Sequence, residues 1–261
     1  MPIKLIALDM DGTLLDSNKN LPPDFTGWVK SHPHIRTVIA SGRQYYTLAK
    51  AFPGVCSQMI FAAENGGIVF ENETVLYLNE MQKEDILACL QLTAPYGHLT
   101  PIVCGAKSAY MKPAKPHILR EAEMYYDRLT LTGDLCHAAL QDSIIKIAVF
   151  ADQKSAEASM AHFTGLKPHL SAVLSGDCWI DVANKTVSKG AAITAIQQKY
   201  GISKGECMAF GDYLNDAELL KSCAESYCMA NGHPKLKALA KYIADSNDND
   251  GVMKILRQLE P

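Results

Sequence analysis

Residues 5–15 read Leu-Ile-Ala-Leu-Asp-Met-Asp-Gly-Thr-Leu-Leu, a short apolar run that leads directly into two carboxylates. The run predicts a buried strand of a parallel sheet, because such strands are apolar along most of their length. Asp9 and Asp11 would then lie at the carboxyl end of that strand, which is where open α/β sheets bind their ligands. Two carboxylates this close repel each other unless a cation lies between them. The segment therefore predicts a charged binding site at the edge of a sheet.

Strand and helix patterns alternate in the first 80 residues and again from Ser188 onward. Such alternation is typical of crossover connections around a parallel sheet. The expected strands lie near 3–9, 35–40, 58–63, 207–210 and 226–229, a hairpin near 68–78, and the expected helices near 23–31, 43–51, 188–200, 214–222, 234–240 and 250–258.

The middle of the chain has a different rhythm, in which strands and helices are mixed. Strands are expected near 100–104, 108–111, 144–150, 170–174 and 178–182, and helices near 82–93, 115–127 and 153–163. We therefore expect a discontinuous core domain of residues 1–80 and 186–261, and an inserted α+β domain of residues 81–185.

A second acidic cluster follows the strand expected near 207–210. Gly211 allows a sharp turn there, and Asp212 and Asp216 are four residues apart, so both can face the same way if a helix begins between them. If the two strand ends are neighbours in one sheet, three or four carboxylates meet with few cations around them. Oxygen ligands of this kind suit Mg²⁺ better than zinc.

Two further segments carry groups suited to phosphate. Ser41, Gly42 and Arg43 follow the second expected strand, where a hydroxyl and backbone amides can hold phosphate oxygens. Lys189 begins a helix and can place a cation against charge that develops on a transferred group.

Taken in order, the motifs DxDGT, Ser-Gly-Arg, Lys-Gly and GDxxND resemble those of the Cof-type phosphatases of the haloacid dehalogenase superfamily. The similarity covers nearly the whole chain and includes Asn65-Gly66, Ile180-Asp181, Asn247-Asp248 and Asp250-Gly251-Val252. It implies a Rossmann-like doubly wound core, with the insertion as a large α/β cap that selects the substrate. The chain departs from the family pattern at Met229-Ala230-Asn231-Gly232, where Gly and Ala have exchanged places around Asn231.

The resemblance also implies roles for individual residues. Asp9 would be the nucleophile that forms an aspartyl-phosphate, and Asp11 would protonate the leaving oxygen and later deprotonate water. The other implied roles are phosphate binding by Thr13, Ser41, Gly42 and Lys189, Mg²⁺ binding by Asp9, Asp212, Asp216 and the backbone carbonyl of Asp11, and support from Arg43, Asn65 and Asn215.

Other functions stay open on the sequence alone. A phosphomutase or a sugar-phosphate phosphotransferase would use the same motifs, and a phosphoacceptor switch would need fewer of them. Arg43 is equally compatible with a substrate contact and a solvated ion pair, and His117 has a minor claim to touch substrate.

The composition narrows the class of partner. With 25 basic and 28 acidic residues the net charge is only −3, which gives no electrostatic case for nucleic acid or an anionic membrane. The eight cysteines form no metal-binding pattern and are expected to be reduced. With no signal peptide or membrane span recognised, we expect a cytoplasmic monomer or homodimer that acts on a small phosphate ester.

Overall fold

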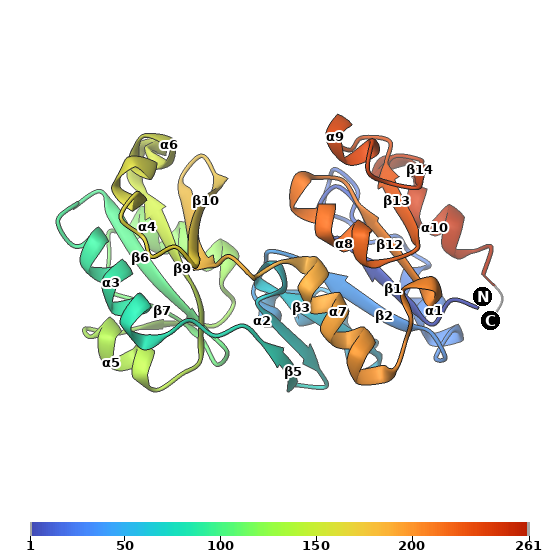
Figure 1. Ribbon diagram of the computed structural model, residues 1–261, viewed down its shortest axis with the longest axis horizontal. Helices are drawn as coiled ribbons and strands as arrows, with labels where there is room; N and C mark the ends of the chain where they lie inside the picture. Colours follow the sequence, from blue (N-terminus) through green and yellow to red (C-terminus); the bar gives the residue numbers. More distant parts are fainter. Residues whose placement is uncertain (1, 260–261) are drawn as a thin grey trace. The chain divides into compact units, whose positions relative to one another are not determined.

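The computed structural model describes residues 2–259, and the contacts within it divide the chain into two compact units (Figure 1). One unit contains the chain up to Tyr77 and from Ser188 onward, and the other is Leu78–Val187. The second unit is therefore an insertion, because the chain leaves the first unit and later returns to it. None of the helices in residues 2–259 is both long and apolar enough to cross a membrane.

The first unit is built on an eight-stranded sheet in the order β14-β13-β12-β1-β2-β3-β4-β5. The strands from β14 through β3 pair in parallel, and β4 pairs with β3 in the antiparallel direction. Their bounds are β1 Leu5–Leu8, β2 Arg36–Ala40, β3 Met59–Ala63, β4 Ile68–Glu71, β5 Thr74–Leu78, β12 Cys207–Gly211, β13 Glu225–Met229 and β14 Tyr242–Ala244. This mainly parallel sheet confirms the predicted α/β class.

The order in which the chain adds strands to the sheet reverses at β1, and this reversal determines where the site lies. The chain proceeds from β1 to β2 on one side, whereas β12 lies on the other side of β1. Leu8 is in register with both Ile39 and Phe210, so the ends of all three strands lie level. Ligands of doubly wound sheets bind at such a switch point, where the loops leave in opposite directions.

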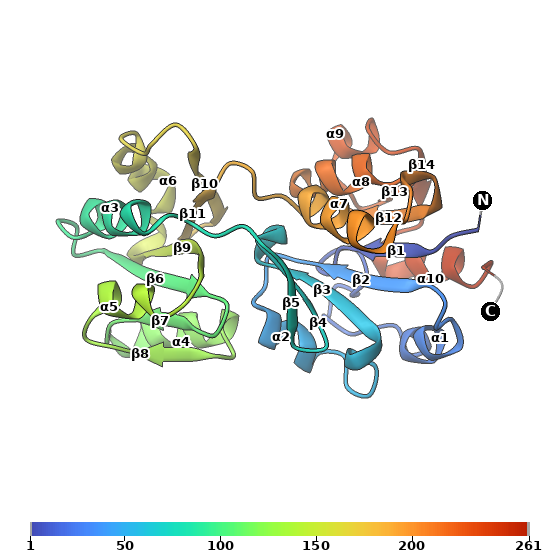
Figure 2. The same cartoon turned by 60° about the horizontal axis from the view of Figure 1, so that its bottom comes forward.

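Helices cover both faces of this sheet (Figure 2). On one face α7 (Lys189–Tyr200) and α8 (Ala217–Ser222) pack against Leu5, Ala7 and their neighbours on the adjacent strands. The short helix α9 (Pro234–Lys237) contributes Leu236 to the same hydrophobic cluster. The opposite face carries α1 (Phe25–Ser31), α2 (Tyr45–Lys50) and α10 (Gly251–Leu256). The indole N–H of Trp28 donates to the Leu256 carbonyl at 3.0 Å, which joins the first and last helices.

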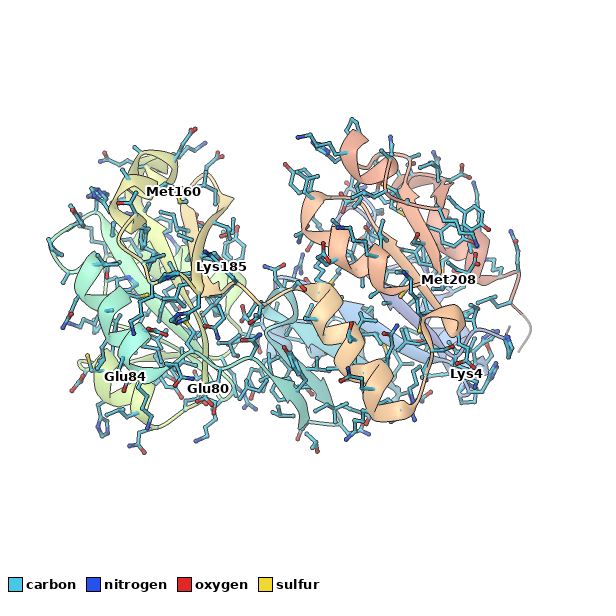
Figure 3. The ribbon with its side chains drawn as sticks, in the orientation of Figure 1. Lys4, Glu80, Glu84, Met160, Lys185 and Met208 are labelled. Carbon is cyan, nitrogen blue, oxygen red and sulfur yellow. The ribbon has the colours of Figure 1, made fainter. Side chains whose placement is uncertain are left out.

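An ion pair and a backbone hydrogen bond join β1 and β12 at their amino ends, opposite the ends that carry the site. Lys4, labelled in Figure 3 with Met208 of β12, places its ammonium 2.6 Å from Glu206, and its N–H donates to the Glu206 carbonyl at 2.8 Å. The opposite, carboxyl ends of these strands carry the acidic side chains.

The second unit contains a six-stranded sheet in the order β10-β11-β9-β6-β7-β8, in which only β7 and β8 pair in parallel. Alternate residues of β9 face different layers: Ile147 and Val149 pack with α3, α5 and α6, whereas Ala148 and Phe150 pack with α4. The elements are α3 Lys83–Thr93, β6 Leu99–Gly105, β7 Ala109–Met111, α4 Pro116–Tyr125, β8 Leu129–Leu131, α5 Leu135–Leu140, β9 Ile144–Ala151, α6 Ala156–Ser159, β10 Leu170–Gly176 and β11 Trp179–Asn184. This mixed sheet with helices confirms the predicted inserted α+β cap.

Two predicted helices differ from those in the structure, and three short elements were not predicted. The single helix expected over 153–163 is broken, because Gln153 and Lys154 have φ angles of 57° and 55° and a 3₁₀ turn replaces its first part. The helix expected near 234–240 ends at Lys237. The elements β8, α5 and β14 were not predicted, since two strands of three residues and a helix of six are too short to show a clear hydrophobic period.

Asp85, a buried carboxylate in the second unit, allows a test of what stabilises that unit. Asp85 has no exposed surface, and its two oxygens lie 2.5 Å from the Lys167 ammonium and 2.7 Å from His169 Nε2. Burial by itself would raise the pKa of Asp85, but hydrogen bonds from Lys167 and His169 lower it below its usual range. The stabilisation is therefore present at neutral pH and disappears as the pH falls through that lowered pKa.

We expect Asp85→Asn to lower the free energy of unfolding by about 1–3 kcal/mol at pH 7, because the new amide NH₂ is buried and faces the Lys167 or His169 donor in place of a carboxylate oxygen. Urea unfolding of the full chain would measure it. The exposed neighbour Glu84 provides a control of equal charge change, Glu84→Gln. A loss that is equal for both variants, or that does not shrink in acid, would contradict this account.

Candidate active site

Three carboxylates meet at the carboxyl ends of the two central strands. Asp9 follows β1, Asp212 follows β12, and Asp216 lies just before α8. One oxygen from each of the three lies within 4.8 Å of the others. Asp9 and Asp216 are buried. The two acidic motifs, 200 residues apart in the chain, therefore form one cluster, as the sequence predicts.

Two glycines make this convergence sterically possible. Gly12 has a φ of +80°, and a Cβ there would lie 2.5 Å from Asp212 Oδ2. A Cβ on Gly211 would lie 2.5 Å from the Asp216 Cβ. The backbone amides of Asp212 and Tyr213 donate to Asp216 Oδ2 at 3.0 and 3.1 Å, which fixes this carboxylate at the turn.

Lys189 supplies a buried cation to the cluster. Its ammonium lies 2.5 Å from Asp9 Oδ1 and 2.6 Å from Asp216 Oδ1. It is the first residue of α7, which Ser188 caps by accepting the Ala191 N–H at 3.0 Å. The backbone of Gly66 passes so close to this turn that a Cβ there would lie 2.3 Å from the Ser188 carbonyl oxygen.

The ionisation of the cluster follows from burial and crowding. Burial, followed by repulsion from Asp216, raises the pKa of Asp9 to about 8. The same two causes raise the pKa of Asp212. Burial would lower the pKa of Lys189, but its contacts with Asp9 and Asp216 raise it instead. The single ammonium of Lys189 thus leaves the pKa values of Asp9 and Asp212 raised.

The donor set fits a divalent hard cation. Three carboxylates and one ammonium leave two formal negative charges, which one Mg²⁺ would neutralise. All available ligand atoms are oxygens, the preference of Mg²⁺. The residues that would hold the ion are Asp9, Asp212 and Asp216, as predicted.

The loop of Ser41, Gly42 and Arg43, which was predicted to bind phosphate, lies beside this cluster. Ser41 is buried after β2, and its Oγ accepts the Arg43 N–H at 3.3 Å. The Asn65 side chain packs over Gly42, where a Cβ would lie 3.2 Å from Asn65 Nδ2. Asn65 itself has a left-handed φ of 56°, and its N–H donates to the Ser41 carbonyl at 2.9 Å. The loop after β3 thus supports the loop after β2.

Thr13 and Asn215 contact protein groups around the cluster. Thr13, predicted to bind phosphate, donates its hydroxyl to Asp212 Oδ1 at 3.3 Å. Asn215, predicted to support the site through the metal or the phosphate, donates to Asn65 Oδ1 at 3.2 Å. Asn215 therefore links the acidic turn to the Ser41 loop.

Asp11 is not one of the three clustered carboxylates, and its oxygens pair with two cations. Arg43 donates from Nε to Oδ2 at 2.9 Å and from Nη2 to Oδ1 at 2.6 Å, and Lys19 Nζ lies 2.9 Å from Oδ1. Partial burial would raise the pKa of Asp11, but these hydrogen bonds lower it. Sequence reasoning missed Lys19, because a single lysine in a loop carries no periodic or motif signal.

The C-terminal loops hold the segment that follows Asp11. Asn231 donates to the Gly12 carbonyl at 2.8 Å, and Asn247 donates to the Leu15 carbonyl at 2.9 Å. The exchange of Gly and Ala around Asn231 therefore leaves this residue in contact with the catalytic loop. Gly232 is required by space, since a Cβ there would lie 2.7 Å from Cys228 Sγ.

Two minor sequence expectations concern residues outside this cluster. His117, in the second unit, pairs with Asp152 at 3.2 Å. All eight cysteines are free thiols, as predicted.

Comparison with known proteins identifies the family to which this constellation belongs. The model of the haloacid dehalogenase-like hydrolases matches residues 6–256. The chain belongs to this family. With its inserted mixed-sheet cap it is a Cof-type phosphatase of the haloacid dehalogenase superfamily, as the motifs indicated.

Similar proteins match the chain over nearly its full length. It is 32% identical to the 5-amino-6-(5-phospho-D-ribitylamino)uracil phosphatase YbjI of Escherichia coli, over 98% of this chain and 96% of that protein. It is 23% identical to a phosphoglycolate phosphatase of Methanothermobacter thermautotrophicus, over 98% of both chains. The crystal structure of SMU.1108c from Streptococcus mutans is 29% identical, with a TM-score of 0.83 over 98% of each chain.

Proposed function

We propose that this phosphatase hydrolyses a small phosphorylated metabolite, a sugar phosphate or a cofactor phosphate, through an aspartyl-phosphate on Asp9. The observation that carries the proposal is the placement of Asp9 among Lys189, Asp212 and Asp216 at the switch point of the sheet. An ionised carboxylate beside a fixed cation is a nucleophile held close to the charge that phosphoryl transfer develops.

In the first proposed step, an Asp9 oxygen attacks phosphorus and the ester oxygen leaves. Asp11 gives that oxygen a proton, and the Lys189 ammonium balances charge on the phosphoryl oxygens. The buried Ser41 hydroxyl, the Gly42 backbone and Thr13 would hold the phosphoryl group in line. A bound Mg²⁺, held by the three carboxylates and the Asp11 carbonyl, would supply further positive charge against the transferred group.

In the second step, Asp11 takes a proton from water, which attacks the phosphorus of the aspartyl-phosphate. The P–O bond to Asp9 breaks, inorganic phosphate leaves, and the Asp9 carboxylate is restored. Asp11 must therefore be protonated in one step and ionised in the next, while Arg43, Asn65 and Asn215 keep the surrounding loops in place. The inserted unit would select the substrate.

The proposal is tested by phosphate release from a panel of esters, headed by 5-amino-6-(5-phospho-D-ribitylamino)uracil because of the similarity to the Escherichia coli enzyme. We expect release in the presence of Mg²⁺ and its loss, by at least about a hundredfold, after treatment with EDTA. Restoration by added Mg²⁺ is the control for damage by the chelator.

The same panel separates the phosphatase from a phosphomutase or a phosphotransferase. Each of those would move the phosphoryl group to another hydroxyl without net phosphate release, and the product would be visible by ³¹P NMR. A protein that instead kept its phosphoryl group for many minutes after treatment with acetyl phosphate would be a phosphoacceptor switch. Either result would contradict the proposed hydrolysis.

A further inference from the structure

Lys19 lies outside every motif that points to the site, yet its ammonium reaches Asp11 Oδ1 at 2.9 Å. Its backbone has a φ of 65°, in the left-handed region that residues with a side chain seldom adopt. Unfavourable backbone of this kind persists only where the surrounding structure enforces it, and it is concentrated at functional sites.

The turn that carries Lys19 is held by a dense set of hydrogen bonds. Asp16 accepts the N–H groups of Asn18 and Asn20 at 2.9 and 2.7 Å, and the Lys19 N–H donates to the Asp16 carbonyl at 2.9 Å. On the outer side, Asp248 accepts both the N–H and the hydroxyl of Ser17 at 2.7 Å. These hydrogen bonds thus fix the backbone position of Lys19.

Asp11 does not need Lys19 to balance its charge. Arg43 already donates to both Asp11 oxygens, at 2.9 and 2.6 Å. The Lys19 side chain is 60% exposed and makes one contact with a carboxylate that is 37% exposed. Of the two cations, Lys19 is therefore the one that can change partners at small cost.

The charge distribution shows which partner it would take. With one divalent cation bound, the three carboxylates and Lys189 would together carry no net formal charge, so groups outside this cluster can add to the attraction of a phosphate dianion. Arg43 and Lys19 are the two cations paired with Asp11, whereas Asp16 and Asp248 in the same turn accept N–H, hydroxyl and amide groups of residues 17–20. A phosphate ester whose leaving oxygen meets Asp11 therefore brings its phosphoryl oxygens close to these two cations.

We infer that Lys19 is a substrate-binding residue, whose ammonium leaves Asp11 for the phosphoryl oxygens of the ester. The exchange frees Asp11 Oδ1 from one of its two cations and makes it available to the ester oxygen. The inference rests on the proposed function, since it assigns Lys19 to the same phosphoryl site.

Lys19→Met tests this assignment without removing the bulk of the side chain. We expect KM for the best ester, and the dissociation constant of inorganic phosphate measured calorimetrically with Mg²⁺ present, to rise about fivefold to tenfold. The value of kcat should change less than twofold, and Lys19→Arg should recover most of the affinity. Lys221→Met removes a similarly exposed lysine, paired with Glu218, and should leave both constants unchanged.

The outcomes separate this inference from the proposed function. Unchanged KM and phosphate affinity in Lys19→Met would overturn it, as would a fall in kcat alone, which would mean that Lys19 acts only through Asp11. If the wild-type protein bound phosphate but hydrolysed no ester, the proposed function would fail. The phosphate titration would still decide the role of Lys19.

Discussion

Replacement of Asp9 by Asn is expected to reduce turnover by at least about a thousandfold, because the neutral amide cannot form the proposed acyl phosphate. The change keeps the shape of the side chain, and the amide oxygen can still accept from Lys189, which lies 2.5 Å from Asp9 Oδ1. The fold and the binding of phosphate should therefore persist. Phosphate release under saturating ester and Mg²⁺ measures the effect.

A matched substitution distinguishes loss of the nucleophile from a general loss of negative charge. Asp24, on the surface, pairs with Arg257, and Asp24→Asn should leave turnover within about twofold of the wild type. Calorimetric titration with inorganic phosphate should show that Asp9→Asn still binds the product. Residual turnover within tenfold of the wild type would exclude Asp9 as the nucleophile.

Lys189→Met should have the second large effect, and it should act on stability as well as turnover. The ammonium is 1% exposed and contacts Asp9 and Asp216, so its removal leaves buried carboxylates without their internal cation. Removing one partner of such a group typically costs about 3–5 kcal/mol. Turnover should fall roughly 100- to 1,000-fold, because a cation that stabilises the transferred group is lost.

The metal dependence of the variant makes this prediction specific. Without Lys189 the three carboxylates carry one more uncompensated negative charge, so added Mg²⁺ should stabilise the variant more than it stabilises the wild type. Urea unfolding with EDTA and with Mg²⁺ measures the difference.

Lys146→Met is the control, since it breaks a buried ion pair with Asp181 in the inserted unit. Its stability should fall, and its response to Mg²⁺ should equal that of the wild type. Equal responses of the two variants to Mg²⁺ would contradict the expected extra negative charge at the three carboxylates in the Lys189→Met variant.

The acidic cluster could be predicted because its parts are local motifs. Asp9 ends an apolar strand, and Asp212 and Asp216 follow another, so each pair is recognisable from a few neighbouring residues. The requirement that parallel strands end at one edge of the sheet then brings the pairs together. Gly211 was predicted for its turn, but its need for space beside Asp216 appears only in three dimensions.

The contacts among the loops could not be predicted in the same way. The pairing of Asp11 with Lys19, and of Asn215 with Asn65, depends on where side chains point after each turn, and that direction follows from the packing of neighbouring loops. The shortest strands could not be predicted for a related reason. A three-residue strand such as β14 (Tyr242–Ala244) is stabilised by its hydrogen bonds to β13, and its own sequence has no period to reveal it.

The amino-acid sequence by itself determined the class of the fold, the two acidic motifs, a lysine at the start of a helix and the existence of an insertion, since hydrophobic periods and turn residues act over short distances in the chain. Only the tertiary structure decided which groups pair within the site. Asp11 meets Arg43 and Lys19 because the sheet sets the loops after β1 and β2 side by side and the turn at Asp16 places Lys19 within reach of Asp11. Electrostatic and hydrogen-bond energies depend on distance in space, so these pairings exist only once the strands are in register.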